Sequence, residues 1–182
     1  MNSTIKRISV VLLGDHGVGK SSVAIRFATN VFMSEYSIHP KQIQVSRVSV
    51  DGTDYDIGVI DTNATMTIQN DDLIMKGDAF VVMYSVTNKN SFLHLPLYLN
   101  RIYELRKDHS KTIPIIIVGN KCDEKRREVI YESGQLFSDS ISCLFMETSA
   151  LDYTNINHLF DIIIREWVSF HPVENNTSCV VA

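Results

Sequence analysis

Residues 14–21 carry the first side chains whose types and spacing could do chemistry. They read GDHGVGKS, which matches the pattern G-x-x-x-x-G-K-[ST] between an apolar run and a helical stretch. Glycines let backbone N–H groups turn toward phosphate oxygens, and the N-terminus of the following helix adds positive charge. Lys20 could reach the β- and γ-phosphates, and the Ser21 hydroxyl could bind Mg²⁺. The predicted phosphate-binding residues are Gly14, Gly17, Val18, Gly19, Lys20, Ser21 and Ser22.

A carboxylate that could hold a metal stands at the end of a second apolar run. Residues 59–65 read VIDTNAT, and Asp61 follows the apolar residues directly. A carboxylate delivered by a buried strand is a suitable oxygen ligand for Mg²⁺. Ser21 and Asp61 are therefore the predicted metal ligands.

Residues 117–123, IVGNKCD, could select the base of a nucleotide. Asp123 can accept two hydrogen bonds from the N1–H and the exocyclic amine of guanine, and adenine offers no such pair of donors. A carboxylate left unpaired beside the wrong base carries a strong penalty. The alternative is an ordinary strand-end turn, in which Asn and Asp are common. Taken alone, the segment leaves both interpretations open.

The apolar runs predict the strands that would position these residues. Four runs rich in β-branched residues are typical of strands buried on both faces of a largely parallel sheet. A weaker run covers residues 143–148, and residues 44–50 alternate apolar and polar residues as an edge strand does. Asp51-Gly52 predicts a hairpin between 44–50 and 55–60. The four strong runs are residues 8–13, 55–60, 79–86 and 114–119.

Amphipathic stretches alternate with the strands and cover residues 20–30, 90–107, 126–138 and 155–169. Pro96 interrupts the second stretch, so its first turn is predicted to be separate or kinked. The element order β-α-β-β-α-β-α-β-α-β-α predicts an α/β, doubly wound domain whose sheet is six-stranded and mostly parallel, with about five flanking helices. Ligands of such domains bind at the carboxyl ends of the strands.

Composition favours a single globular domain in a reducing compartment. The chain has 182 residues and a net charge of −4, so it lacks a basic surface for nucleic acid, and no such partner is expected. The cluster Lys125, Arg126, Arg127 is interpreted as a solvated loop or helix start. Three widely spaced cysteines favour the cytoplasm over a disulfide framework. We find neither a membrane-spanning run nor a signal peptide.

Four motifs in this order resemble the Ras superfamily of small GTPases: GDHGVGKSS, Asp61-Thr62, NKCD at 120–123 and ETSA at 147–150. The resemblance covers nearly the whole chain. It implies a P-loop NTPase (small G-protein) fold over residues 1–170. A protein of this kind is expected to bind GTP and GDP with Mg²⁺ and to be a monomer. It also implies a flexible tail over residues 171–182.

The resemblance further implies which residues contact the base and which contact other proteins. Effector or regulator proteins are expected to bind residues 33–48 and 65–76. The implied guanine contacts are Phe32, Asn120, Lys121, Asp123, Ser149 and Ala150.

Four positions near the γ-phosphate depart from the family pattern. His16 stands in the phosphate loop where Ras proteins have glycine, and its side chain would crowd the transition state. His39 falls at the position of the switch I threonine, and imidazole is a poor Mg²⁺ ligand. Ala64 and Thr65 replace the glycine that contacts the γ-phosphate and the glutamine that orients water. With no catalytic residue matched at His16 or Thr65, slow or absent GTP hydrolysis is predicted.

The changed positions leave other interpretations open. Either histidine could act as a general base, because imidazole exchanges protons near neutral pH. A partner protein could complete a competent GTPase. The chain could also be a nucleotide-independent adaptor, although the intact loop at 14–21 argues against this. An ATP-using kinase is disfavoured by Asn120, Lys121 and Asp123.

The residues Cys179-Val180-Val181-Ala182 fit the C-a-a-X pattern, and Ala in the last place points to farnesylation of Cys179. Residues 171–178 contain no Lys, no Arg and no second cysteine. One lipid without a polybasic segment binds membranes reversibly. The sequence therefore predicts signalling at the cytoplasmic face of a membrane, the plasma membrane foremost, with exchangeable attachment.

Overall fold

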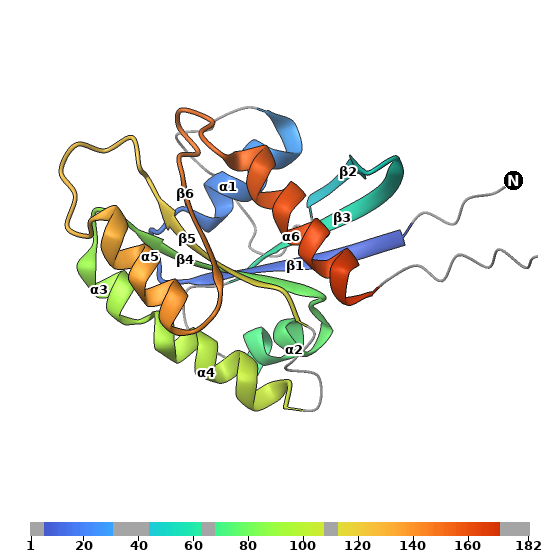
Figure 1. The fold of residues 1–182 in the computed structure, drawn as a ribbon, viewed down its shortest axis with the longest axis horizontal. Coiled ribbons are helices and arrows are strands. Elements are labelled where there is room, and N and C mark those ends of the chain that lie inside the picture. Colours follow the sequence, from blue (N-terminus) through green and yellow to red (C-terminus); the bar gives the residue numbers. More distant parts are fainter. Residues whose placement is uncertain (1–5, 31–43, 63–67, 108–112, 172–182) are drawn as a thin grey trace, which may run out of the picture.

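The computed structural model describes residues 6–30, 44–62, 68–107 and 113–171, which form a sheet with helices on both faces (Figure 1). This confirms the predicted α/β class. The strands are β1 (Lys6–Gly14), β2 (Gln44–Val50), β3 (Thr53–Asp61), β4 (Ala79–Ser85), β5 (Ile115–Asn120) and β6 (Leu144–Thr148). The helices are α1 (Lys20–Thr29), α2 (Ile68–Lys76), α3 (Lys89–Leu93), α4 (Leu95–Leu105), α5 (Tyr131–Ser140) and α6 (Ile156–Phe170).

The sheet has six strands in the order β2-β3-β1-β4-β5-β6. β2 runs antiparallel to β3 and lies at an edge, as its alternating sequence predicts. Asp51 and Gly52 have φ values of 51° and 77°, which suit a two-residue hairpin turn, and Val50 pairs with Thr53 across it. The predicted hairpin is therefore confirmed.

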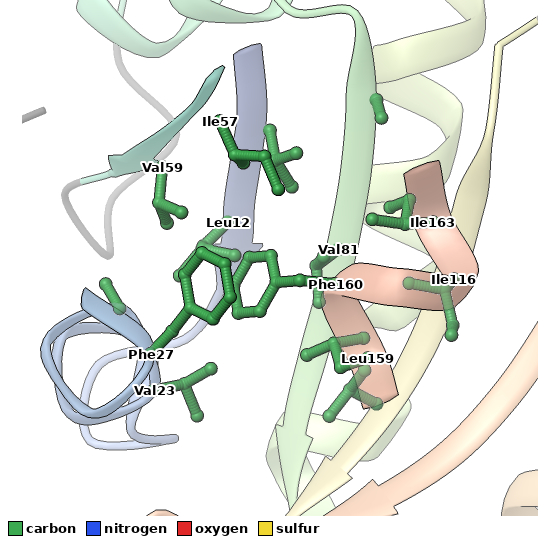
Figure 2. Packing of buried hydrophobic residues seen from close by; sticks show 14 of the residues in the cluster. Leu12, Val23, Phe27, Ile57, Val59, Val81, Ile116, Leu159, Phe160 and Ile163 are labelled. Atoms are coloured by element: carbon green, nitrogen blue, oxygen red, sulfur yellow. The ribbon is translucent and has the colours of Figure 1, made fainter. Parts of the chain in front are cut away.

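Successive residues of the central strands face opposite sides of the sheet, as strand geometry requires. Along β1, Val10 belongs to one hydrophobic cluster and Val11 to the other. Helices α1 and α6 cover the first side, where the rings of Phe27 and Phe160 stack with centroids 3.8 Å apart (Figure 2). Helices α2, α4 and α5 cover the second side. Continuous apolar runs were the right signal because these strands are buried on both faces.

The helical stretch predicted over residues 90–107 divides in two, as Pro96 predicts. The short α3 begins after Asn88, whose side chain accepts a hydrogen bond from the Ser91 N–H at 3.2 Å. Helix α4 then carries Pro96 in its first turn, where the missing N–H has no helical partner to lose. The division turns the chain and directs His94 toward the phosphate loop.

Helix α5 begins at Tyr131 and not at residue 126, so that predicted boundary is wrong. The N–H groups of Glu128 and Val129 both donate to the Val86 carbonyl oxygen, at 2.8 and 3.0 Å. Arg127 is partly buried and pairs with Glu147, so the solvated interpretation is wrong for this residue and right for its exposed neighbours. These tertiary contacts hold residues 126–130 beside β4 and β6, so α5 begins only after them.

The parallel strands bring their carboxyl ends to one edge of the sheet. β1 lies between β3 and β4, which both follow it in the chain, so the strand order reverses at β1. Ligands of doubly wound folds bind where the order reverses. Gly14, Asp61, Asn120 and Thr148 end four of these strands and therefore share this edge.

Candidate functional site

The loop between β1 and α1 has a backbone shape that requires glycine at both ends. Gly14 has a φ of 144°, and a Cβ there would lie 2.2 Å from the carbonyl oxygen of Met83. Gly19 caps α1 with a φ of 98°, and a Cβ there would lie 2.2 Å from Nδ2 of Asn120. A side chain at either position would displace β4 or Asn120. The loop thus places the N-terminus of α1 at the carboxyl edge of the sheet. The N–H groups at that N-terminus favour binding of an anion.

Lys20 is buried at the start of α1 and folds back over the loop. Its ammonium donates to the backbone oxygens of Gly14 and Asp15, at 2.8 and 3.0 Å. Burial lowers the pKa of Lys20, while the carboxylates of Asp61 and Asp15 oppose that shift. Phosphate oxygens are stronger partners for an ammonium than neutral carbonyls are. Lys20 is therefore suited to bind phosphate at this position.

Ser21 and Asp61 meet beside Lys20. The Ser21 hydroxyl donates to Asp61 Oδ2, whereas Asp61 Oδ1 is buried without a hydrogen-bond partner among the described residues. Burial raises the pKa of Asp61, and the hydrogen bond from Ser21 and the charge of Lys20 partly offset it. An orphaned carboxylate oxygen next to a hydroxyl fits a divalent cation.

The small number of donors indicates which cation suits this position. Across residues 6–30, 44–62, 68–107 and 113–171, no group of three or more His, Cys, Asp or Glu residues could hold a metal. Mg²⁺ commonly uses one or two protein oxygens and takes the rest from water and substrate phosphates. The pair Ser21 and Asp61 therefore fits Mg²⁺ that arrives with a phosphorylated ligand.

Asn120 ties the predicted base-binding segment to the phosphate loop. Its side chain is buried, its Nδ2 donates to the Val18 carbonyl oxygen at 2.8 Å, and its Oδ1 accepts from Thr148 Oγ1 at 3.0 Å. One side chain thus joins the ends of β5 and β6 to the loop after β1. The structure gives Asn120 a positioning role besides the base contact predicted for it.

The turn after Asn120 has an unusual backbone that presents Asp123. Lys121 is a non-glycine residue with a φ of 67°, and such left-handed residues concentrate at functional turns. The Cys122 N–H donates to the Thr148 carbonyl oxygen at 3.1 Å, which fastens the turn to β6. Asp123 is partly exposed on this turn. Its carboxylate is thus available at the carboxyl edge of the sheet.

The segment after β6 brings Ser149 and Ala150 to the same edge, and both are buried. The Ser149 N–H donates to the Thr154 carbonyl oxygen at 3.1 Å, and Ser149 Oγ accepts from the Asp152 N–H at 3.0 Å. These bonds fold residues 149–154 into a closed turn. The predicted base contacts from the backbone of this segment thus come from a fixed turn.

An ion pair that no sequence motif predicts lies beneath these loops. Arg127 Nη1 lies 3.1 Å from Glu147 Oε2, and Arg127 Nη2 contacts Glu147 Oε1. The pair joins the segment before α5 to β6. Glu147 opens the motif ETSA, so the acidic residue was a signal that a cation would lie nearby.

The structure does not describe five of the predicted site residues. Phe32, His39, Ala64, Thr65 and Cys179 lie outside the described residues, so their roles stay predictions. His16 is described, and its side chain is exposed on the phosphate loop.

A doubly wound sheet with a glycine-rich, Lys-Ser loop at the point where the strand order reverses defines a P-loop nucleotide-binding protein. Comparison with known proteins makes the class more specific. A family model described as Ras family matches residues 9–169. The chain is 32% identical over 166 residues to Ras-like protein 1 of Saccharomyces cerevisiae, covering 90% of this chain.

The chain therefore belongs to the Ras family, the family of small GTP-binding proteins that its motifs indicated. Family membership implies binding of guanine nucleotide with Mg²⁺ in general terms. The chain spans about half the length of the curated relative, 53% of it.

Proposed function

We propose that the chain binds GDP and GTP with Mg²⁺ and acts in signal transduction, with slow or absent hydrolysis of GTP. The observation that carries the proposal is the convergence of Lys20, Ser21 and Asp61 beside a glycine-shaped loop to which Asn120 is bonded. The orphaned oxygen of Asp61 supports a cation at this position. Membership of the Ras family supports guanine nucleotide as the ligand.

The protein's own groups divide the work of binding. Lys20 has three N–H donors and bonds to two carbonyl oxygens, so it can add a phosphate oxygen as a further partner when nucleotide enters. Ser21 and Asp61 would hold Mg²⁺, which would neutralise part of the phosphate charge. Asp123 accepts the two donors of guanine, and Lys121 is its neighbour among the expected base contacts. Because Asn120 bonds to Val18, binding of the base and binding of the phosphates are mechanically coupled.

Slow hydrolysis rests on the residues near the γ-phosphate. His16 adds an exposed side chain to the loop at the point where water and a partner's arginine approach in efficient GTPases. Thr65 has too short a side chain to orient water as glutamine does. His39 and Ala64 weaken the contacts that report the third phosphate. We therefore expect partner proteins that bind residues 33–48 and 65–76 to distinguish GTP from GDP only weakly.

Membrane association rests on Cys179, the first residue of the C-a-a-X pattern. Among the described helices, none is long and apolar enough to cross a membrane. We propose a single farnesyl group, reversible attachment and a location at the cytoplasmic face of the plasma membrane. Mass spectrometry of the native protein tests this, and an unmodified Cys179 followed by intact Val180-Val181-Ala182 contradicts it.

Titration with fluorescent GDP and with a non-hydrolysable GTP analogue, with and without Mg²⁺, tests the nucleotide proposal. We expect tight, Mg²⁺-dependent binding of GDP and equal or weaker binding of the analogue. Lys20→Ala, the matched control, should lose both ligands. Clear preference for the analogue would contradict the loss of γ-phosphate sensing. If neither GDP nor the analogue bound, the result would favour the alternative that the chain is a nucleotide-independent adaptor.

A single-turnover assay tests hydrolysis on the GTP-loaded protein. We expect a rate well below that of an efficient Ras-like protein, and a rise in the triple variant His16→Gly/Ala64→Gly/Thr65→Gln. A wild-type rate as high as that of an efficient relative would overturn the proposal. A rate restored only by a partner protein would favour the partner-completed GTPase.

A further inference from the structure

The side chain of Asp15 in the phosphate loop is held by two residues near the α3–α4 junction. His94 Nδ1 lies 2.7 Å from Asp15 Oδ2, and the Tyr98 hydroxyl donates to Asp15 Oδ1 at 2.8 Å. A carboxylate only accepts hydrogen bonds, so the ring nitrogen of His94 is the donor. Both oxygens of Asp15 are therefore engaged by side chains that follow it by 79 and 83 residues.

The break between α3 and α4 explains how these two donors converge. His94 is the last cap of α3 and the first cap of α4. Residues four positions apart lie on one face of a helix, so His94 and Tyr98 point the same way. Tyr98 is buried and its position is fixed by packing in the second hydrophobic cluster, whereas His94 reaches the same carboxylate from the surface.

Asp15 is also bound to the phosphate-binding lysine. Its backbone oxygen accepts a hydrogen bond from Lys20 Nζ at 3.0 Å. Asp15 thus contacts α4 with its side chain and Lys20 with its main chain. A carboxylate in a phosphate loop repels phosphate unless its charge is directed elsewhere. The two donors direct that charge toward α4.

We propose that His94 and Tyr98 are positioning residues for nucleotide binding, which hold Asp15 so that its carboxylate faces α4 and its carbonyl faces Lys20. The inference rests on the proposed function, because it assumes that the loop binds phosphate. Without the two donors, the freed carboxylate repels the phosphates and the main chain at Asp15 loses its anchor. Nucleotide then leaves faster.

The rate of GDP release from the full chain in Mg²⁺ tests the proposal. We expect about tenfold faster release from Tyr98→Phe and from His94→Ala, as for the loss of a hydrogen bond to a charged group. His94→Gln should restore most of the lost binding, because its amide can donate to the same oxygen. Tyr103→Phe, on the same helix and away from the loop, is the matched control and should release GDP at the wild-type rate.

The same substitutions in an Asp15→Ala background separate positioning from packing. Without the carboxylate, Tyr98→Phe and His94→Ala should change the release rate no further. Equal acceleration with and without Asp15 would overturn the inference, because the helix residues would then act by packing alone. Unchanged release from every variant would overturn it as well. If the wild-type chain bound no nucleotide, the proposed function itself would fail, and that outcome is visible before any variant is made.

Discussion

The two sides of the candidate site differ in how complete they are. On the base side, residues 120–123 and 148–150, the buried amide of Asn120 is engaged at both ends and the turns close on each other. On the metal side, residues 20, 21 and 61, a buried carboxylate oxygen has no partner in the described chain and an ammonium rests on carbonyls. The base side is closed by its own hydrogen bonds, whereas the metal side has an unpaired oxygen that the proposed Mg²⁺ would satisfy.

The two sides show where the requirements of folding and of ligand binding conflict. A buried polar atom without a partner is destabilising, and such atoms persist where a ligand will use them. The base side contributes to stability with or without nucleotide. The unpaired oxygen on the metal side lowers the stability of the empty protein, and binding of Mg²⁺ and nucleotide as proposed would restore it.

The largest effect is expected from Asn120→Ala, which opens the base side. It leaves the Val18 carbonyl and the Thr148 hydroxyl buried without partners, which costs about 3 kcal/mol of unfolding free energy and about 100-fold in GDP affinity. Denaturant unfolding and GDP titration measure the two effects. Asn100→Ala, on the exposed face of α4, is the control and should change neither. A stable variant that lost only affinity would mean that Asn120 contacts the base alone and that the base side is not preformed.

Asp61→Asn should act with opposite signs on stability and on metal binding. Removing a buried charge that has an orphaned oxygen stabilises the empty protein by about 1 kcal/mol. The same change should abolish the stabilisation that Mg²⁺ and GDP together give the wild type. Thermal unfolding with EDTA, and with Mg²⁺ and GDP, measures both.

Asp78→Asn is the control for that experiment, because Asp78 accepts the Ser9 N–H at 2.8 Å as a structural carboxylate. It should leave the response to Mg²⁺ unchanged. If Asp61→Asn destabilised the empty protein, the metal side would be complete without its ligand, and the contrast between the two sides would disappear.

Arg127→Met should weaken the support beneath the base side. It leaves Glu147 without its cation, and because the pair is only partly buried we expect a loss of about 2 kcal/mol in unfolding free energy. The double variant Arg127→Met/Glu147→Gln should regain part of that loss. Arg126→Met, the exposed neighbour, should have no measurable effect. Equal losses in both arginine variants would mean that charge in general, and not this pair, supports the segment.

Sequence alone predicted what local patterns encode. The buried strands were found because both of their faces are apolar, and the phosphate loop because its chemistry lies within eight consecutive residues, GDHGVGKS. The start of α5 was predicted wrongly, because Glu128 and Val129 donate to Val86, and propensity cannot anticipate that bond.

The connections between motifs were also hidden from the sequence. The contact of Asn120 with Val18 joins residues 102 positions apart, and that of His94 with Asp15 joins residues 79 apart. A carboxylate and a histidine so far apart give no periodic signal. Only the sheet order, which sets α4 beside the loop after β1, brings them together.

The smallest effect tests an orphaned hydroxyl that lies beneath the base side, near Gly119 and Glu147. Tyr84 is fully buried in β4, its hydroxyl has no partner in the described chain, and burial raises its pKa well above the usual value. Tyr84→Phe should therefore stabilise the protein by about 1 kcal/mol in denaturant unfolding, because it removes an unpaired polar atom. Tyr98→Phe, the matched control, removes a hydroxyl that donates to Asp15, so it should destabilise. Equal destabilisation by both would show that Tyr84 has a partner such as water, so that no unpaired group lies beneath the base side and the two sides differ more strongly.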